Sequence, residues 1–184
     1  MEKQTKEAMK WSNKVEAKVE GWLKGAPHLP KEAQKWLAKN AWWLVAIGAG
    51  LSAISILTML NGLFVSSLYL GNYYGTWSGS GLWTVRTLIQ IVFMVVVVAI
   101  SLAAIKPLRG LSKKGWDYIF LAFLVGAVSS VITTLISYNV FSVIFSLVFI
   151  AVFFAIGAWL LFEIRSYFKK PHSKPHKSHT TVKK

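Results

Sequence analysis

The sequence predicts an all-α integral membrane protein, in which four transmembrane helices form a bundle between an amphipathic N-terminal helix and a basic tail. Three observations support this fold class. Hydrophobic residues make up 54% of the 184 residues and charged residues 15%, whereas soluble domains average about 25% charged residues. The apolar residues form long blocks, and the charges lie between these blocks or at the chain ends. A bilayer imposes this segregation because charges are costly in hydrocarbon.

The first two predicted spans cover about residues 41–65 and 82–105. Each exceeds the roughly 20 residues that a helix needs to cross a bilayer. The second contains a run of β-branched residues, Val95–Val98, which favours a strand in water. A bilayer admits only helices or closed barrels, and the run lacks the alternation of barrel strands. We therefore predict a helix for both segments.

The third and fourth spans lie in the apolar block between Trp116 and Phe162, which is too long for one span. The polar and aromatic trio Ser137–Asn139 interrupts this block and is suited to a turn at the membrane interface. We therefore predict spans at about 116–136 and 140–162, joined as a tight hairpin.

Residues 1–24 have the pattern of a basic amphipathic helix. Apolar residues recur at helical spacing, namely Ala8, Trp11, Val15, Val19 and Trp22, and lysines recur every four residues on another face, namely Lys6, Lys10, Lys14 and Lys18. Such helices lie in the membrane interface with lysines towards anionic lipid. We therefore expect lipid-surface contacts from Lys10, Trp11, Lys14, Lys18 and Trp22. Glu16 and Glu20 are expected to pair with lysines along the same helix. The alternative is a solvated, partly frayed leader.

Pro30 is suited to the first turn of a second helix, which is expected to run into the first span. At the other end of the chain, residues 164–184 are rich in proline, polar residues and like charges, and we predict a disordered basic tail. Its histidines, His172, His176 and His179, are interrupted by prolines, so no metal site is predicted. The chain thus divides into a helical segment 1–40, a transmembrane domain 41–163 and the tail.

The distribution of basic residues predicts the orientation. Residues 1–40 contain nine lysines, the 106–115 loop contains four basic residues and residues 164–184 contain seven. The connections 66–81 and 137–139 contain no charge. Under the positive-inside rule, both termini and the middle loop are cytoplasmic in a multi-pass protein of the cell membrane. The short outer connections are typical of a prokaryotic protein.

The net charge of +14 is explained by this topology, because nearly all of the excess faces the cytoplasm. We therefore expect anionic lipid at the cytoplasmic leaflet as a partner and no specific nucleic acid.

Arg86 is the one clear ionisable residue inside a predicted span, and Gln90 lies one turn deeper on the same helix face. With Asn61 of the first span they form a candidate intramembrane polar site, since polar groups in a membrane often mark function. The alternative is that Arg86 extends to lipid phosphate at the outer interface.

Two sets of structural contacts are also predicted. At the inner interface, ion pairs are expected among Lys113, Asp117, Glu163 and Arg165. Small residues four apart predict close helix packing at Ala46 and Gly50, Ala49 and Ala53, Gly126 and Ser130, and Ala151 and Ala155.

Enzyme chemistry has little support in the sequence. Cysteine is absent, so thiol chemistry is excluded. The common signatures of metalloproteases, serine hydrolases, Walker nucleotide sites and dinucleotide sites are missing. We expect a non-enzymatic assembly, scaffold or accessory subunit without a cofactor, acting as a homo-oligomer or with another membrane protein. The alternative is a small oligomeric channel or transporter for an anion or an uncharged solute, using Arg86 and Gln90.

Overall fold

The computed structural model describes residues 2–23, 25–73, 80–136 and 140–168, and these contain five helices. Their bounds are α1 Glu2–Leu23, α2 Lys31–Tyr73, α3 Ser80–Arg109, α4 Lys113–Leu135 and α5 Val140–Arg165. Each of α2 to α5 contains a segment long and apolar enough to cross a membrane. An all-helical chain with four candidate membrane spans is thus confirmed.

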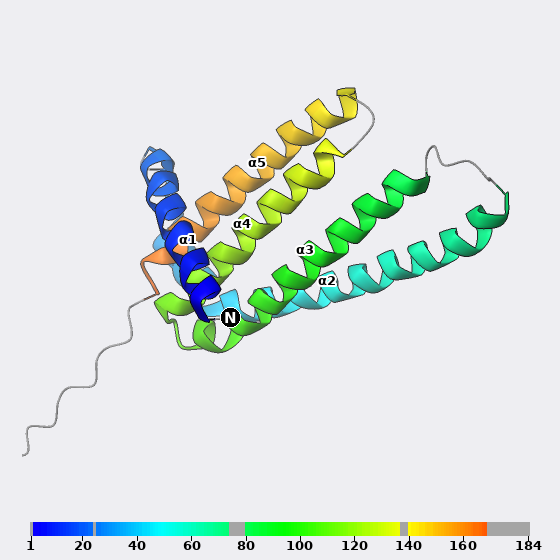
Figure 1. Ribbon diagram of the computed structural model, residues 1–184. Helices are drawn as coiled ribbons and strands as arrows, with labels where there is room; N and C mark the ends of the chain where they lie inside the picture. Colours follow the sequence, from blue (N-terminus) through cyan, green and yellow to red (C-terminus); the bar gives the residue numbers. More distant parts are fainter. Residues whose placement is uncertain (1, 24, 74–79, 137–139, 169–184) are drawn as a thin grey trace, which may run out of the picture.

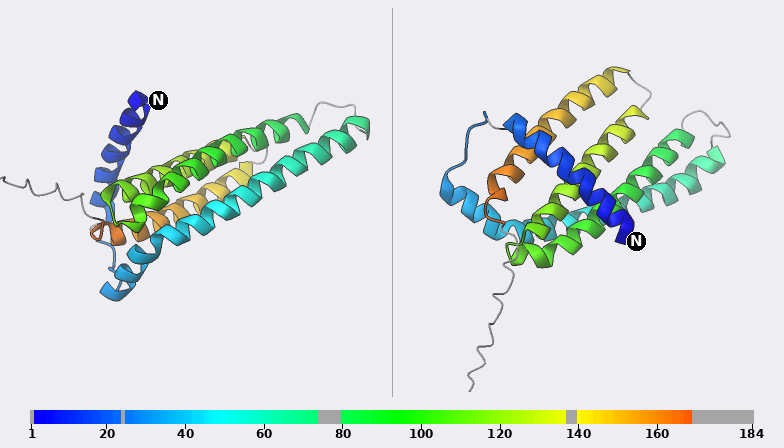
Figure 2. Two further views of the ribbon diagram at one scale, coloured as in Figure 1. Left: turned by 90° about the horizontal axis from the view of Figure 1, so that it is seen from below. Right: turned by 60° about the vertical axis from the view of Figure 1, so that its left-hand side comes forward.

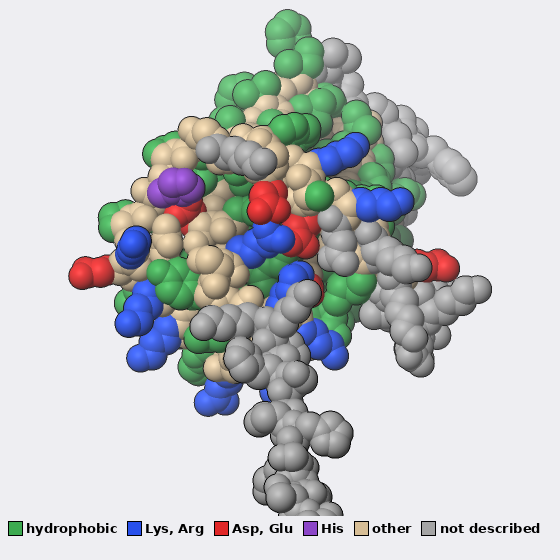
Figure 3. All heavy atoms as spheres, turned by 90° about the vertical axis from the view of Figure 1, so that its left-hand side faces the viewer, with side chains coloured by type: hydrophobic (Ala, Val, Ile, Leu, Met, Phe, Trp, Pro, Cys, Tyr) green, Lys and Arg blue, Asp and Glu red, His purple; other side chains and the backbone are tan. Residues whose placement is uncertain are grey.

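The four long helices lie side by side and alternate in direction, while α1 runs across one end of them (Figures 1 and 2). α3 packs against both α2 and α4, α4 also packs against α5, and α2 meets α5. Because the directions alternate, the starts of α2 and α4 and the ends of α3 and α5 gather at the end crossed by α1. We call this the basic end; it comprises residues 25–40, 104–120 and 161–168. Figure 3 shows it facing the viewer, with Lys, Arg, Asp and Glu side chains on its surface.

The helices are longer than the predicted apolar segments. α2 begins at Lys31, directly after Pro30, whose carbonyl accepts a hydrogen bond from the Gln34 amide at 3.1 Å. α3 continues through Pro107 to Arg109, although this proline has no N–H to bond to the carbonyl of Ala103, four residues earlier. α2 likewise extends to Tyr73. The predicted turn at 137–139 lies outside the described residues.

The turn between α3 and α4 brings two backbones close together. Leu111 adopts φ 47°, and the Ser112 hydroxyl caps α4 by accepting a hydrogen bond from the Lys114 amide at 3.3 Å. A Cβ atom added to Gly115 would lie 2.7 Å from the backbone nitrogen of Leu108. Only glycine therefore allows α4 to start against the end of α3.

The most buried core lies at the basic end. Trp116 and Phe120 are fully buried and stack with their ring centres 5.1 Å apart, and Phe162 meets both rings edge-on. Ala104 and Leu108 of α3 belong to the same cluster. Away from this end many large apolar side chains are exposed, as expected of surfaces in contact with lipid.

Close helix packing occurs at glycines other than the predicted ones. A Cβ added to Gly157 of α5 would lie 2.7 Å from the Phe123 ring of α4. No atom lies within 4 Å of a Cβ added to Gly50 or Gly126, and Ala151 is exposed. Within this chain, the sequence motifs at these three positions do not mediate close packing.

Candidate functional site

Charged side chains of α1 and of the basic end form an ion-pair network that joins α1 to α4 and α5. Arg165 of α5 binds Glu16 and also Glu20, the latter at 2.7 Å. Lys113 of α4 lies 2.8 Å from Asp117 and 4.0 Å from Glu16. The Glu16 side chain is only 6% exposed, so its charge depends on these two cations. We call these five residues the acid–base network.

α1 contributes to the network through its polar face. Glu16 and Glu20 are four residues apart, so both face Arg165. Ser12, one turn before Glu16, is also buried. Both acids therefore pair with a cation from another helix, which the pattern of α1 alone did not predict.

The apolar stripe of α1 is only partly covered. Trp11 is 49% exposed and Trp22 83% exposed, and Lys14 and Lys18 are exposed as well. The side chain of Lys10 lies outside those described. α1 is thus held by its polar groups and by Val15, which packs against the core of the basic end, while its two tryptophans remain available for other contacts.

The network lies directly on the aromatic core. The Arg165 guanidinium is 5.5 Å from the centre of the Trp116 ring and 5.7 Å from that of Phe162. Lys113 approaches the same Trp116 ring at 5.8 Å. The Trp116 indole donates a hydrogen bond to the Leu161 carbonyl at 2.9 Å, which fixes the ring between α4 and α5. The cations that hold α1 are themselves positioned by this core.

Glu163 holds the connection between α1 and α2. Its carboxylate contacts His28 Nδ1 at 2.7 Å and accepts hydrogen bonds from the Leu29 amide at 2.9 Å and from Gln34 Nε2 at 2.7 Å. Glu163 and Arg165 therefore have different partners. The physical reason is that residues two apart on a helix point about 200° away from each other.

Two further hydrogen bonds attach this connection to α5. Trp159 Nε1 donates to the Pro27 carbonyl at 2.8 Å, and the Tyr167 hydroxyl donates to the Lys31 carbonyl at 3.2 Å. Sequence reasoning missed the contributions of His28 and Gln34, since each depends on a residue more than 120 positions away.

The candidate intramembrane site is less well defined. Arg86 and Gln90 are half-buried on α3, whereas Asn61 is exposed on α2. Among the described residues, no hydrogen bond or ion pair joins the three side chains. The sequence contains no Asp or Glu between Glu32 and Asp117 or between Asp117 and Glu163. Arg86 therefore has no carboxylate of this chain near its own depth.

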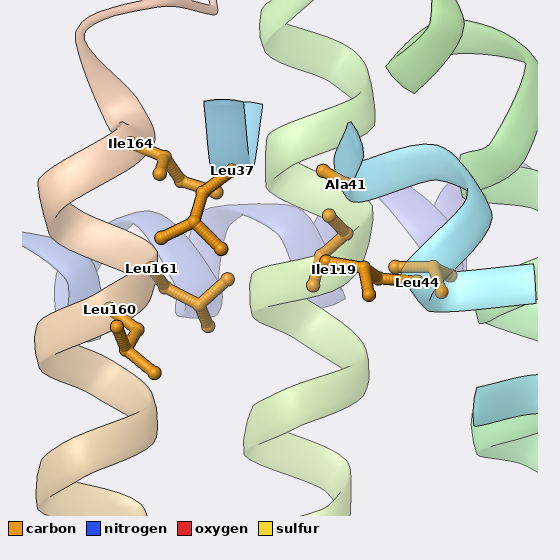
Figure 4. A pocket seen from close by; sticks show the side chains of 8 residues that line it. Leu37, Ala41, Leu44, Ile119, Leu160, Leu161 and Ile164 are labelled. Carbon is orange, nitrogen blue, oxygen red and sulfur yellow. The ribbon is translucent and has the colours of Figure 1, made fainter. Parts of the chain in front are cut away.

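An apolar cavity of about 160 Å³ lies between α2, α4 and α5 (Figure 4). Its walls are aliphatic side chains, namely Leu37, Ala41, Leu44 and Val45 of α2, Ile119 of α4, and Leu160, Leu161 and Ile164 of α5. The hydrogen bond between Gln34 and Glu163 bridges α2 and α5 next to the cavity. Such walls suit hydrocarbon and offer no group for acid–base chemistry.

No group of three or more His, Asp or Glu residues able to hold a metal ion occurs in the described part of the chain. The histidines of the tail lie outside it. Comparisons with protein-family models, with curated proteins and with solved structures give no match. Function must therefore be inferred from the residues themselves.

Proposed function

We propose that this chain is a non-enzymatic membrane subunit, with an assembly, scaffold or accessory role, that presents α1 at the cytoplasmic face of a cell membrane. The observation that carries this proposal is the acid–base network, in which Glu16 of α1 contacts Arg165 at the end of α5 and Lys113 at the start of α4. Their charges are engaged in fixed ion pairs, which suits positioning of a helix better than turnover of a substrate.

In this proposal the basic end is cytoplasmic, together with both termini. The positive-inside rule supports that orientation, since the four basic residues of the 106–115 loop lie here. α1 then runs along the membrane plane, because it crosses the ends of helices that span the bilayer (Figure 2). Exposed Trp11 and Trp22 are suited to the headgroup layer, and Lys14 and Lys18 to anionic lipid.

The partner is a second copy or another membrane protein that contacts the positioned α1. The test is quantitative crosslinking in native membranes, followed by purification of the intact chain. In the wild type we expect a stoichiometric crosslinked adduct between this chain and its partner. The double variant Glu16→Gln with Glu20→Gln releases α1, so this adduct should be lost. The control, Glu7→Gln with Glu32→Gln, removes two exposed carboxylates and should keep the adduct. Recovery of the chain as a monomer without any adduct would contradict the proposal.

One observation favours a second function, a small oligomeric channel or transporter for an anion or an uncharged solute. Arg86 is half-buried in a segment of the chain without carboxylates. An anion in a pathway along α3 is a suitable counter-ion for it. Flux measured in proteoliposomes should then be abolished by Arg86→Ala. Absence of flux for a broad panel of anions and neutral solutes rejects this function.

A further inference from the structure

The basic end contains a second group of cations, which differ from those of the acid–base network. They are Lys39 of α2 and Lys106 and Arg109 of α3, and we call them the α2–α3 cations. All three side chains are exposed. None has an ion pair with a described residue, whereas Lys113 and Arg165 each bind carboxylates. The positive charge of the α2–α3 cations is therefore available to an external anion.

Arg109 is held in a defined position. Its guanidinium lies 4.7 Å from the centre of the Trp42 ring, a cation–π contact. Trp42 is itself half-buried and packs against the core of the basic end. A guanidinium lying on an aromatic face keeps its N–H groups free at the edge, where they can bind a phosphate with two parallel hydrogen bonds.

Lys106 lies three residues before Arg109 and therefore beside it on the surface of α3. Directly beyond them, α3 exposes aliphatic side chains on the same face: Leu102 is 56% exposed and Val95 49% exposed. This arrangement matches a phospholipid. The cations at the end of the span suit its anionic headgroup, and the aliphatic surface that continues along the span suits its acyl chains. A water-soluble acidic partner would use the cations but not this apolar surface.

We propose that the α2–α3 cations bind the phosphate of an anionic phospholipid in the cytoplasmic leaflet. Arg109 supplies the bidentate contact on its Trp42 platform, and Lys106 and Lys39 add positive charge around it. Basic pockets between transmembrane helices on this side of a membrane are suited to anionic headgroups. The alternative is that these cations only set the membrane topology or complement the dipole of α3. In that case the protein would bind all phospholipids equally, so selectivity for anionic lipid distinguishes the two roles.

The test uses the full chain purified in a mild detergent and titrated with phosphatidylglycerol or with phosphatidylcholine of the same acyl chains. Bound lipid is counted by native mass spectrometry. We expect preferential binding of phosphatidylglycerol, and the variant Lys106→Gln with Arg109→Gln should lose about fivefold in affinity per cation removed. Trp42→Leu, which keeps every charge, should lose part of the preference. The control Lys31→Gln with Lys35→Gln, at exposed positions earlier on α2, should bind like the wild type.

Several outcomes would overturn the proposal. One is equal binding of the two lipids by the wild type, and another is an equal loss of phosphatidylglycerol affinity in the control variant. A third is that the purified chain retains RNA or an acidic protein that phosphatidylglycerol does not displace. If the double variant fails to fold, a salt titration of the wild type decides. The phosphatidylglycerol preference should fall as sodium chloride rises, and a preference independent of salt argues against an ionic site.

Discussion

Glu16 illustrates how one side chain can determine the place of a whole helix. It is the only carboxylate of the acid–base network that contacts both Arg165 and Lys113. Its side chain is nearly inaccessible to solvent, so removal of its charge breaks a buried ion pair and leaves Arg165 with only Glu20 and Lys113 with only Asp117.

We therefore expect Glu16→Gln to lower the free energy of unfolding by about 2 kcal/mol, the cost of losing a hydrogen-bonded contact to a charged group. Thermal unfolding of the purified chain in detergent, followed by circular dichroism, measures the change. Glu7→Gln is the matched control, because Glu7 is exposed on the same helix. Equal unfolding temperatures for the two variants would show that the network contributes no stability.

Gly115 provides a second test at the scale of single residues. Its missing side chain allows contact with the Leu108 backbone, which cannot move away as a flexible side chain could. Gly115→Ala should destabilise the protein by about 1–3 kcal/mol, as expected for overpacking.

Gly126→Ala is the control for this substitution, because an added Cβ there meets no atom within 4 Å. Alanine is favoured over glycine in a helix by about 1 kcal/mol, so this variant should unfold at the same or a higher temperature. Loss of stability in Gly126→Ala but not in Gly115→Ala would contradict the described packing of α3 on α4.

At the scale of the helix, the four apolar elements were predictable from the sequence, and α1 was predictable only as a helix. A long apolar run directly predicts a helix that crosses the bilayer, because about 20 such residues are needed to span it. Hydropathy does not report where a helix begins, but Pro30 does: the helix predicted to start there and run into the first span is α2, which begins at Lys31.

The buried face of α1 was predictable from periodicity only in part. Of the predicted apolar stripe, Val15 packs against the core, whereas Trp11 and Trp22 stay exposed. The buried polar residues Ser12 and Glu16 were not predicted to face the bundle. The partner of Glu16 is Arg165, at the far end of the chain, and no local pattern connects the two. The four-residue spacing of Glu16 and Glu20 indicated that both acids lie on one face of α1. It did not indicate which cation they would bind.

α1 should lie at the level of the lipid headgroups, and its depth is measurable. The chain has no cysteine, so a spin label can be placed at Trp22→Cys alone. Its accessibility to oxygen and to a water-soluble nickel complex should match the headgroup region. A label at Leu57→Cys, an exposed mid-helix position of α2, gives the hydrocarbon reference. A label at Trp22→Cys with the accessibility of bulk water would place α1 off the membrane.

At the scale of the whole molecule, the two ends are built differently. The basic end combines the acid–base network, the Glu163 contacts and the aromatic core around Trp116. Beyond it, the helices expose large apolar side chains such as Phe141 and Phe153. Lipid can cover such surfaces at no cost, because hydrocarbon gives no hydrophobic drive for helix association. The polar contacts and the largest buried aromatic cluster are therefore concentrated at the basic end.

We expect four membrane spans, with the basic end and both termini facing the cytoplasm. Single cysteines introduced into the cysteine-free chain test this topology directly, with a membrane-impermeant maleimide applied to intact cells. Ser80→Cys and Asn139→Cys should be labelled from outside, whereas Gly25→Cys and Gly110→Cys should be labelled only after the cells are lysed. Labelling of Gly25→Cys or Gly110→Cys in intact cells, or protection of both outer positions, would contradict the account.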